Sequence, residues 1–167
     1  QLPRKALTPY FGPGDDELDR AGVNAVFLGY YFPWDPEMTR DLAIEHGFTP
    51  REEGSLTGSW NYADIDDQTI SVHHWMKWYK FGFTRLFDNL SVDIRHGVMT
   101  REAAVQAIKD DPIAPPRTDI NLFCEFTGMT RDDFSATCER FRNKDIWKRR
   151  GDAWVLPDFI DSDRRWA

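Results

Sequence analysis

The stretch that decides the fold is residues 66–82, which read DDQTISVHHWMKWYKFG. Its apolar side chains recur at helical spacing. One face is formed by four of them: Val72, Trp75, Met76 and Tyr79. Four more widen that face on its flanks: Ile70, His74, Trp78 and Phe81. The acids at the start suit the positive end of a helix, and Gly82 can end it. Because only His73, Lys77 and Lys80 fall together on a polar stripe, the pattern predicts a central helix buried over most of its circumference.

Further helices are predicted on both sides of this one from their boundary residues. Asp35 is a good N-cap and Pro36 a good first residue for a helix that runs through Ile44 and stops at Gly47. Capping residues and apolar spacing place the other helices at 84–95, 100–108, 119–126 and 130–141.

Two short stretches predict β structure. Residues 23–32, VNAVFLGYYF, are short, apolar and rich in β-branched and aromatic side chains, which favours a buried strand. Residues 147–156, with Gly151 in the middle, predict a small hairpin. The sequence therefore predicts a mainly α chain with a little β structure.

Composition excludes several classes of protein. With 41% hydrophobic and 14% aromatic residues among 167, the chain is neither disordered nor of low complexity. It has no apolar run near the roughly 20 residues of a membrane span, and no apolar signal segment follows its start. A net charge of −7 argues against non-specific nucleic-acid binding. Without an initiator Met, the chain is expected to be cut from something longer or processed.

The two cysteines, Cys124 and Cys138, lack the CxxC spacing of a zinc site, so we expect reduced core thiols in a cytoplasmic protein. The adjacent His73 and His74 would point about 100° apart on a helix, which favours packing or surface roles over a shared metal. No phosphate loop, zinc-protease motif or nucleophile elbow is present, and no metal site is predicted.

Ionisable and aromatic residues crowd together in residues 80–104, KFGFTRLFDNLSVDIRHGVMTREAA. Asp93 falls on the apolar face of its predicted helix, where a carboxylate requires a partner. Three arginines are candidate partners, and the turn at Gly97 would bring the last of them back toward Asp93: Arg85, Arg95 and Arg101. Two interpretations stay open. The cluster is either an ion-pair network that locks two helices together, or an anion-binding corner lined by Asp88, Ser91 and Arg95.

Two other places carry weaker signals. Residues 55–63, SLTGSWNYA, combine hydroxyl groups, Gly and Asn, which suit hydrogen bonding to a polar ligand or form a solvated connection. Trp34 and Asp35 follow the predicted strand, where α/β sheets bind ligands. The alternative for this pair is an ordinary helix cap beside a core tryptophan.

Five blocks of this sequence resemble the C-terminal half of the N-acetyl sugar amidotransferases. They are YFPWDP (31–36), GSWNYADIDD (58–67), KFGFTR (80–85), DIRHGVMTRE (93–102) and NKDIW (143–147). These bacterial enzymes act in the biosynthesis of surface polysaccharides, including lipopolysaccharide, and of nonulosonic acids. The resemblance spans about residues 27–156, and the order of the blocks is more specific than any one of them.

The resemblance implies an activity and a domain plan. ATP adenylylates the amide oxygen of a sugar acetamido group, and ammonia from a partner glutamine amidotransferase displaces AMP to give an acetamidino group. ATP and Mg²⁺ would bind mainly in an N-terminal PP-loop half, whose Ser-Gly-Gly-x-Asp-Ser loop is missing from this sequence. Residues 1–35 would be a linker and the end strand of that α/β sheet. Residues 36–167 would be a helical, substrate-facing domain that does not turn over alone.

The resemblance also implies roles for residues in binding a nucleotide-activated N-acetyl sugar. Four cationic side chains would hold phosphate or carboxylate: Lys80, Arg85, Arg95 and Arg101. Three polar ones would read hydroxyl groups: Asn61, Tyr62 and Asp88. Asp93 would orient an arginine, and Trp34 and Asp35 would lie at the edge of the nucleotide domain. The alternative function is a non-catalytic helical module that docks a partner subunit or self-associates as a homodimer.

Overall fold

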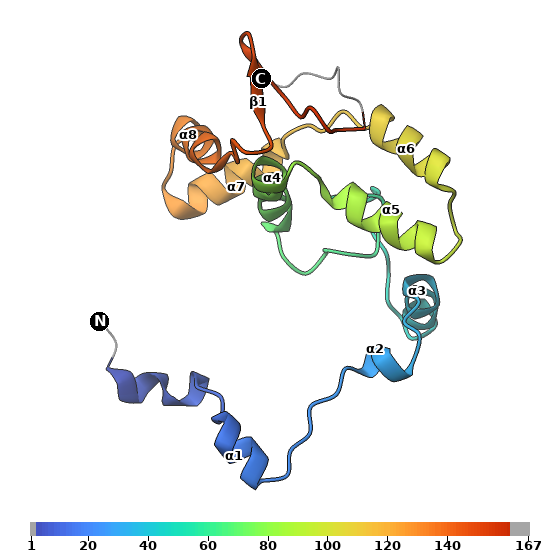
Figure 1. Cartoon of the computed structure of the whole chain (residues 1–167), viewed down its shortest axis with the longest axis vertical. Helices are drawn as coiled ribbons and strands as arrows, with labels where there is room; N and C mark the ends of the chain where they lie inside the picture. Colours follow the sequence, from blue (N-terminus) through green and yellow to red (C-terminus); the bar gives the residue numbers. More distant parts are fainter. Residues whose placement is uncertain (1–2, 161–167) are drawn as a thin grey trace. The chain divides into compact units, whose positions relative to one another are not determined.

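The structure is a computed structural model that describes residues 3–160 (Figure 1). The chain splits into two compact units, the first ending at Thr39 and the second beginning at Arg40. The helices in chain order are η1 (Arg4–Tyr10, a 3-10 helix), α1 (Asp15–Arg20), α2 (Leu28–Tyr31), α3 (Pro36–Glu45), α4 (Ile70–Phe81), α5 (Arg85–Arg95), α6 (Arg101–Asp110), α7 (Arg117–Thr127) and α8 (Arg131–Phe141). The strands β1 (Lys148–Arg150) and β2 (Ala153–Val155) follow. The prediction of a mainly helical chain with a small hairpin is confirmed.

The first unit lacks the strand that the sequence predicts at 23–32. Residues 23–27 have no regular structure, and the next four form the single turn α2. A strand requires a neighbour to accept its backbone hydrogen bonds, and the sheet of residues 3–160 contains β1 and β2 alone. The side chains expected to be buried are exposed instead: Val26, Phe27, Leu28, Tyr30, Tyr31 and Phe32. The predicted end strand is therefore wrong for this chain.

Helix α3 begins and ends close to where the sequence predicts. The Asp35 carboxylate Oδ1 accepts hydrogen bonds from the backbone N–H groups of Glu37 and Met38, at 2.9 and 3.1 Å. These bonds satisfy N-terminal donors that have no partner inside the helix. The helix ends at Glu45, and Gly47 follows with a φ of 95°. The cap interpretation of Asp35 is thus confirmed, while Trp34 beside it is exposed rather than in the core.

Helix α4 is the central element of the second unit, as its sequence predicts. It packs against α7 and α8, while α5 packs against α6. The helix begins at Ile70 rather than at 66, because the Asp67 carboxylate accepts from the N–H and hydroxyl of Thr69 and turns the chain first. Gly82 ends it in the left-handed region, with a φ of 72°.

Three apolar clusters hold the second unit together. The first joins α4 to α7 and α8 through Val72, Ile120, Cys124, Phe134 and Cys138. The second joins α4 to the hairpin through Trp78, Ile113, Trp147 and Leu156. The third joins α5 to α6 through Leu90, Ala104 and Ile108. Both cysteines are free and buried, as predicted. The prediction that Phe81 widens the buried face of α4 is wrong, because Phe81 lies at the last helical position and is exposed.

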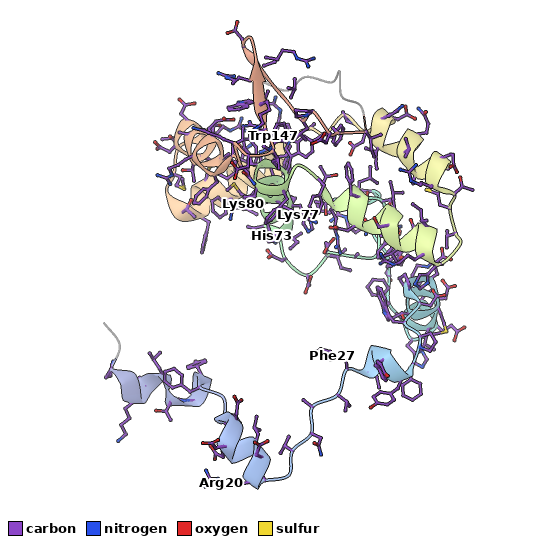
Figure 2. All side chains as sticks on the ribbon, in the orientation of Figure 1. Arg20, Phe27, His73, Lys77, Lys80 and Trp147 are labelled. Atoms are coloured by element: carbon purple, nitrogen blue, oxygen red, sulfur yellow. The ribbon has the colours of Figure 1, made fainter. Side chains whose placement is uncertain are left out.

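Short polar caps and a hairpin fix the remaining boundaries. The hydroxyl groups of Thr100 and Thr130 accept from the N–H groups of Ala103 and Asp133 at the starts of α6 and α8. Strands β1 and β2 are antiparallel, and Arg149 lies opposite Trp154. Gly151 takes a positive φ in the two-residue turn between them, where glycine is favoured. In Figure 2, Trp147 lies at the foot of this hairpin, beside α4.

Candidate functional site

A cavity of about 280 Å³ lies where the loop at 55–58 meets α4 and α5, and we call it the loop–helix pocket. It is lined by Ser55, Leu56, Thr57, Gly58, Ser71, His74, Trp75, Thr84, Arg85, Asp111, Ala114 and Pro116. The walls therefore combine an indole ring with hydroxyl groups, an imidazole, a guanidinium and a carboxylate. This mixture suits a polar ligand that also has an apolar face.

Gly58 lets the loop approach α5 at this pocket. A Cβ atom at position 58 would lie 2.0 Å from Asn89 Oδ1, and the φ of Gly58 is 73°. In place of a side chain, the buried amide of Asn89 accepts a hydrogen bond from the backbone N–H of Ser59 at 3.1 Å. The glycine is thus required both for its backbone conformation and for the close contact.

Two further bonds hold the loop against α5. The indole Nε1 of Trp60 donates to Asp93 Oδ1 at 3.2 Å. Arg85 reaches back to the loop and donates from Nε and Nη2 to the two carboxylate oxygens of Asp64, at 2.8 and 3.3 Å. This two-point contact fixes the guanidinium plane at the rim of the pocket.

The structure gives Asp93 a different hydrogen-bond donor from the three that its sequence position suggests. The indole of Trp60 donates to it, and this residue comes from the loop rather than from the next helix. Arg95 and Arg101 are both exposed, and neither forms an ion pair within residues 3–160. Within this part of the chain, neither arginine therefore pairs with Asp93 as the ion-pair interpretation expects.

Arg85 instead belongs to a charged group near the start of α5. Its Nη1 lies 3.7 Å from Asp88 Oδ2, and Lys77 of α4 donates to that same carboxylate oxygen. The ammonium of Lys77 also lies over the ring of Phe83, 4.3 Å from its centroid. The structure thus brings two of the predicted site residues, Arg85 and Asp88, together, and it adds Lys77 from the predicted polar stripe.

His74 lies at the pocket wall with a hydroxyl partner. Its Nδ1 is 2.9 Å from the hydroxyl oxygen of Thr57. Burial lowers the pKa of the His74 imidazole; the Asp64 carboxylate acts against this, and Arg85, His73 and Lys77 reinforce it. His74 is therefore neutral near pH 7 and can exchange hydrogen bonds with a ligand without introducing a buried charge.

Two other polar groups of the pocket differ in how they are satisfied. The Ser71 hydroxyl donates to the Asp119 carboxylate of α7. The hydroxyl oxygen of Thr84 is buried and has no hydrogen-bond partner among residues 3–160, although Thr84 lines the cavity and precedes α5 as its N-cap residue. A buried hydroxyl without a partner costs free energy. A ligand that bonds to it would remove that cost.

A strained residue, Ile113, lies in the chain between two lining residues of the pocket, Asp111 and Ala114. Ile113 has a φ of 49°, which is unfavourable for a β-branched side chain. Its backbone N–H donates to Asp111 Oδ1 at 3.0 Å, and its side chain is buried beside Trp78 and Trp147. The buried contacts and this bond hold Asp111 and Ala114 in place along the cavity.

The remaining predicted site residues do not line this pocket. Lys80 is exposed, with its ammonium 5.1 Å from the ring centroid of Phe141 on α8. Figure 2 shows it with His73 and Lys77 along α4. Asn61 donates from its amide to the Arg51 carbonyl at 3.1 Å. Tyr62 stacks on Trp60 with the centroids 5.4 Å apart. Both side chains thus shape the loop, whereas Trp34 belongs to the first unit.

Sequence reasoning missed several residues of the pocket: Ser71, His74, Thr84 and Asp111. His74 was attributed to packing on a central helix, and only the neighbouring loop shows that it faces a cavity. Thr57 and Gly58 fall inside the hydroxyl-rich stretch that the sequence singles out. A polar residue inside an otherwise apolar helical face is the signal that could have identified His74.

No metal centre accompanies the pocket in the part of the chain described. Within residues 3–160, no three His, Cys, Asp or Glu side chains gather as metal ligands. No helix there is both long and apolar enough to cross a membrane.

Residues 57–159 match the family described as "LPS biosynthesis protein WbpG-like, C-terminal domain". The chain belongs to this family. The match begins at Thr57, so it takes in the loop that docks on Asn89, every helix from α4 to α8 and the hairpin. Apart from Ser55 and Leu56, all residues that line the loop–helix pocket fall inside the WbpG-like domain. No curated protein matches the chain significantly.

Proposed function

We propose that this WbpG-like domain is the C-terminal, substrate-binding part of an ATP-dependent amidotransferase. The enzyme converts the N-acetyl group of a nucleotide-activated sugar into an acetamidino group in lipopolysaccharide or related glycan biosynthesis. The observation that carries the proposal is the loop–helix pocket, which lies almost wholly within the matched residues and contains a buried hydroxyl, that of Thr84, without a partner.

The lining of this pocket supports a carbohydrate ligand. Sugars present hydroxyl groups around the ring edge and weakly apolar C–H faces. Hydrogen-bonding groups for the sugar hydroxyls come from Thr84 Oγ1, the neutral imidazole of His74 and the guanidinium of Arg85. The indole of Trp75 supplies a flat apolar surface for the C–H faces of the sugar ring. Arg85 stays fixed by Asp64, so it donates from a preorganised position.

ATP and Mg²⁺ are proposed to bind outside this chain. The sequence has no Ser-Gly-Gly-x-Asp-Ser loop, and residues 3–160 contain no cluster of metal ligands. The residues present therefore do not fit a nucleotide-triphosphate and metal site. The ammonia that replaces the amide oxygen is proposed to come from a glutamine amidotransferase subunit. The role of this chain is then to bind the sugar and orient its acetamido group.

Thr84→Val tests the proposal in the complete enzyme that contains this chain. The substitution keeps the shape of the side chain and removes a hydroxyl that neither caps α5 nor bonds to any other group in the described part of the chain. We expect the melting temperature to hold or rise, because the buried hydroxyl has no partner to lose, and the KM for the nucleotide-activated sugar to rise about tenfold, the value of one hydrogen bond. Thr49→Val, at an exposed residue, is the matched control. An unchanged KM in the Thr84 variant would contradict sugar binding in this pocket.

A second candidate function rests on the first unit. Its exposed aromatic side chains would suit a module that docks a protein partner or a second copy of the chain. Size-exclusion chromatography over a range of concentrations tests self-association. Titration of this chain with the glutaminase subunit tests docking of a protein partner. Binding of that subunit to this chain alone, together with no effect of Thr84→Val on sugar turnover, would favour the docking module.

A further inference from the structure

A second cavity of about 170 Å³ lies between α4, α7 and α8. It is lined by Trp75, Tyr79, Pro115, Arg117, Ile120, Arg131, Phe134, Ser135 and Cys138, and we call it the basic aromatic pocket. It combines two guanidinium groups with three aromatic side chains. Neither the sequence motifs nor the loop–helix pocket accounts for this arrangement.

The charge in this pocket is positive, although the protein as a whole is acidic. The chain carries 28 acidic and 21 basic residues, yet the lining contributed by residues 3–160 contains two arginines and no carboxylate. Neither Arg117 nor Arg131 forms an ion pair with residues 3–160, and both are exposed at the first positions of α7 and α8. Two guanidinium groups that share a cavity without a counter-charge favour an anionic ligand.

Acids near this pocket are engaged elsewhere. Asp119 accepts from Ser71, Asp133 accepts from the Thr130 hydroxyl, and Glu139 pairs with Arg142. The thiol at the cavity wall adds no negative charge either, because burial raises the pKa of Cys138 to about 11. Asp119 and Asp133 keep their negative charges, because their donors are neutral hydroxyl groups, so an anion would be held by direct contact with Arg117 and Arg131 rather than by a net positive surface.

The two cavities share a wall. Trp75 lines both of them. Along the segment between α6 and α7 the residues alternate, since Ala114 and Pro116 line the loop–helix pocket while Pro115 and Arg117 line the basic aromatic pocket. The two cavities are therefore neighbours, with Trp75 and residues 114–117 between them.

We propose that the basic aromatic pocket binds the nucleoside diphosphate end of the activated sugar, with the phosphates between Arg117 and Arg131 and the base against Trp75 or Tyr79. This inference rests on the proposed function, because the sugar end would occupy the loop–helix pocket. Aromatic side chains stack on bases without requiring a particular one. The nucleotide is thus held by its charge and its ring, and the sugar by hydrogen bonds.

Calorimetric titration of the 167-residue chain with uridine, guanosine and thymidine diphosphates tests the proposal. Pyrophosphate and the free nucleosides serve as separate arms, because the pocket should bind the whole molecule more tightly than either part. We expect Arg117→Gln with Arg131→Gln to weaken binding of at least one nucleoside diphosphate on the order of a hundredfold. Arg140→Gln with Arg150→Gln removes the same charge at exposed positions away from the cavity and should leave binding unchanged.

The outcomes separate this inference from the proposed function. Equal binding in the wild type and the Arg117/Arg131 variant, or equal loss in the Arg140/Arg150 control, would overturn the nucleotide site, as would failure of all three nucleoside diphosphates to bind. Circular dichroism confirms that each variant is folded. If Arg117 and Arg131 are required for nucleotide binding but Thr84→Val leaves sugar turnover unchanged, the nucleotide site is supported and sugar binding in the loop–helix pocket is contradicted. If Thr84→Val raises the KM for the sugar but the Arg117/Arg131 variant still binds the nucleotide, only the nucleotide site is overturned.

Discussion

The two units of this chain use aromatic residues in opposite ways. In the first unit, Phe27 is 89% exposed and Tyr30 is 87% exposed. In the second unit, Trp78 and Trp147 are each 1% exposed, and their rings meet edge to face with centroids 5.0 Å apart. Both units are rich in large apolar side chains, so composition alone does not distinguish them.

The difference lies in how many elements converge on the side chains. Trp78 projects from α4 toward the hairpin and the segment before α7, so three parts of the chain exclude water from it. The aromatic residues of the first unit lie on one short turn and the coil around it. Burial therefore depends on partners brought from elsewhere in the sequence, and the family match falls on the unit that supplies them.

The largest expected effect is at Trp78. Trp78→Ala removes a fully buried ring that contacts Trp147 and Phe159, and the loss of a large core side chain costs about 3–5 kcal/mol. Trp34→Ala in the first unit is the matched control, with an expected loss of less than about 1 kcal/mol because its ring is exposed. Urea unfolding curves measure both. Equal losses would contradict the contrast between the units.

Gly58 gives the next largest effect. Gly58→Ala combines a left-handed backbone cost with the clash against Asn89 Oδ1, together about 3 kcal/mol. Gly54→Ala is the control that separates the two causes, because Gly54 also has a positive φ but has open space around its Cβ position. Hydrogen exchange of the Ser59 amide, which donates to Asn89, reports whether the loop has left α5. Similar exchange in the two variants would exclude the contact as a cause.

His74 links the pocket to pH. The folded protein lowers the pKa of this imidazole, so the unfolded chain binds its proton more readily. The stability that depends on neutral His74 is complete above the unfolded pKa of about 6.5 and is lost as the pH falls toward the lower folded value. We expect the melting temperature to drop less between pH 7.5 and 5 in His74→Gln than in the wild type. His73→Gln, at the exposed neighbour, should keep the wild-type profile.

Helix boundaries were the part of the fold that the sequence predicted best, because each depends on residues next to it. Asp35, Gly82, Thr100 and Thr130 act on backbone groups within a few positions, so their chemistry is readable locally. The strand at 23–32 failed for the opposite reason. Its formation depends on a second strand, which residues 3–160 do not provide.

The candidate site was predictable only in outline. The hydroxyl-rich loop and Arg85 were singled out from residue type and spacing. The actual partner of Arg85, Asp64, comes from a loop whose path no periodicity predicts, and Asp64 itself adopts a positive φ of 57°. The pairing of Trp60 with Asp93 bridges 33 residues in the same way. Contacts of this kind follow from the folded path of the loop rather than from local pattern.

The smallest expected effect is in the first unit, and it is the sharpest test of the comparison. Phe27→Ser with Tyr30→Ser removes two large rings, yet both are almost fully exposed in this chain, so we expect the free energy of unfolding to change by less than about 0.5 kcal/mol. Urea unfolding at several protein concentrations measures it. A loss above 2 kcal/mol that is independent of concentration would show that these rings are buried within the chain. A loss that grows with concentration would show instead that they are covered by a second copy, because self-association stabilises the folded state by mass action.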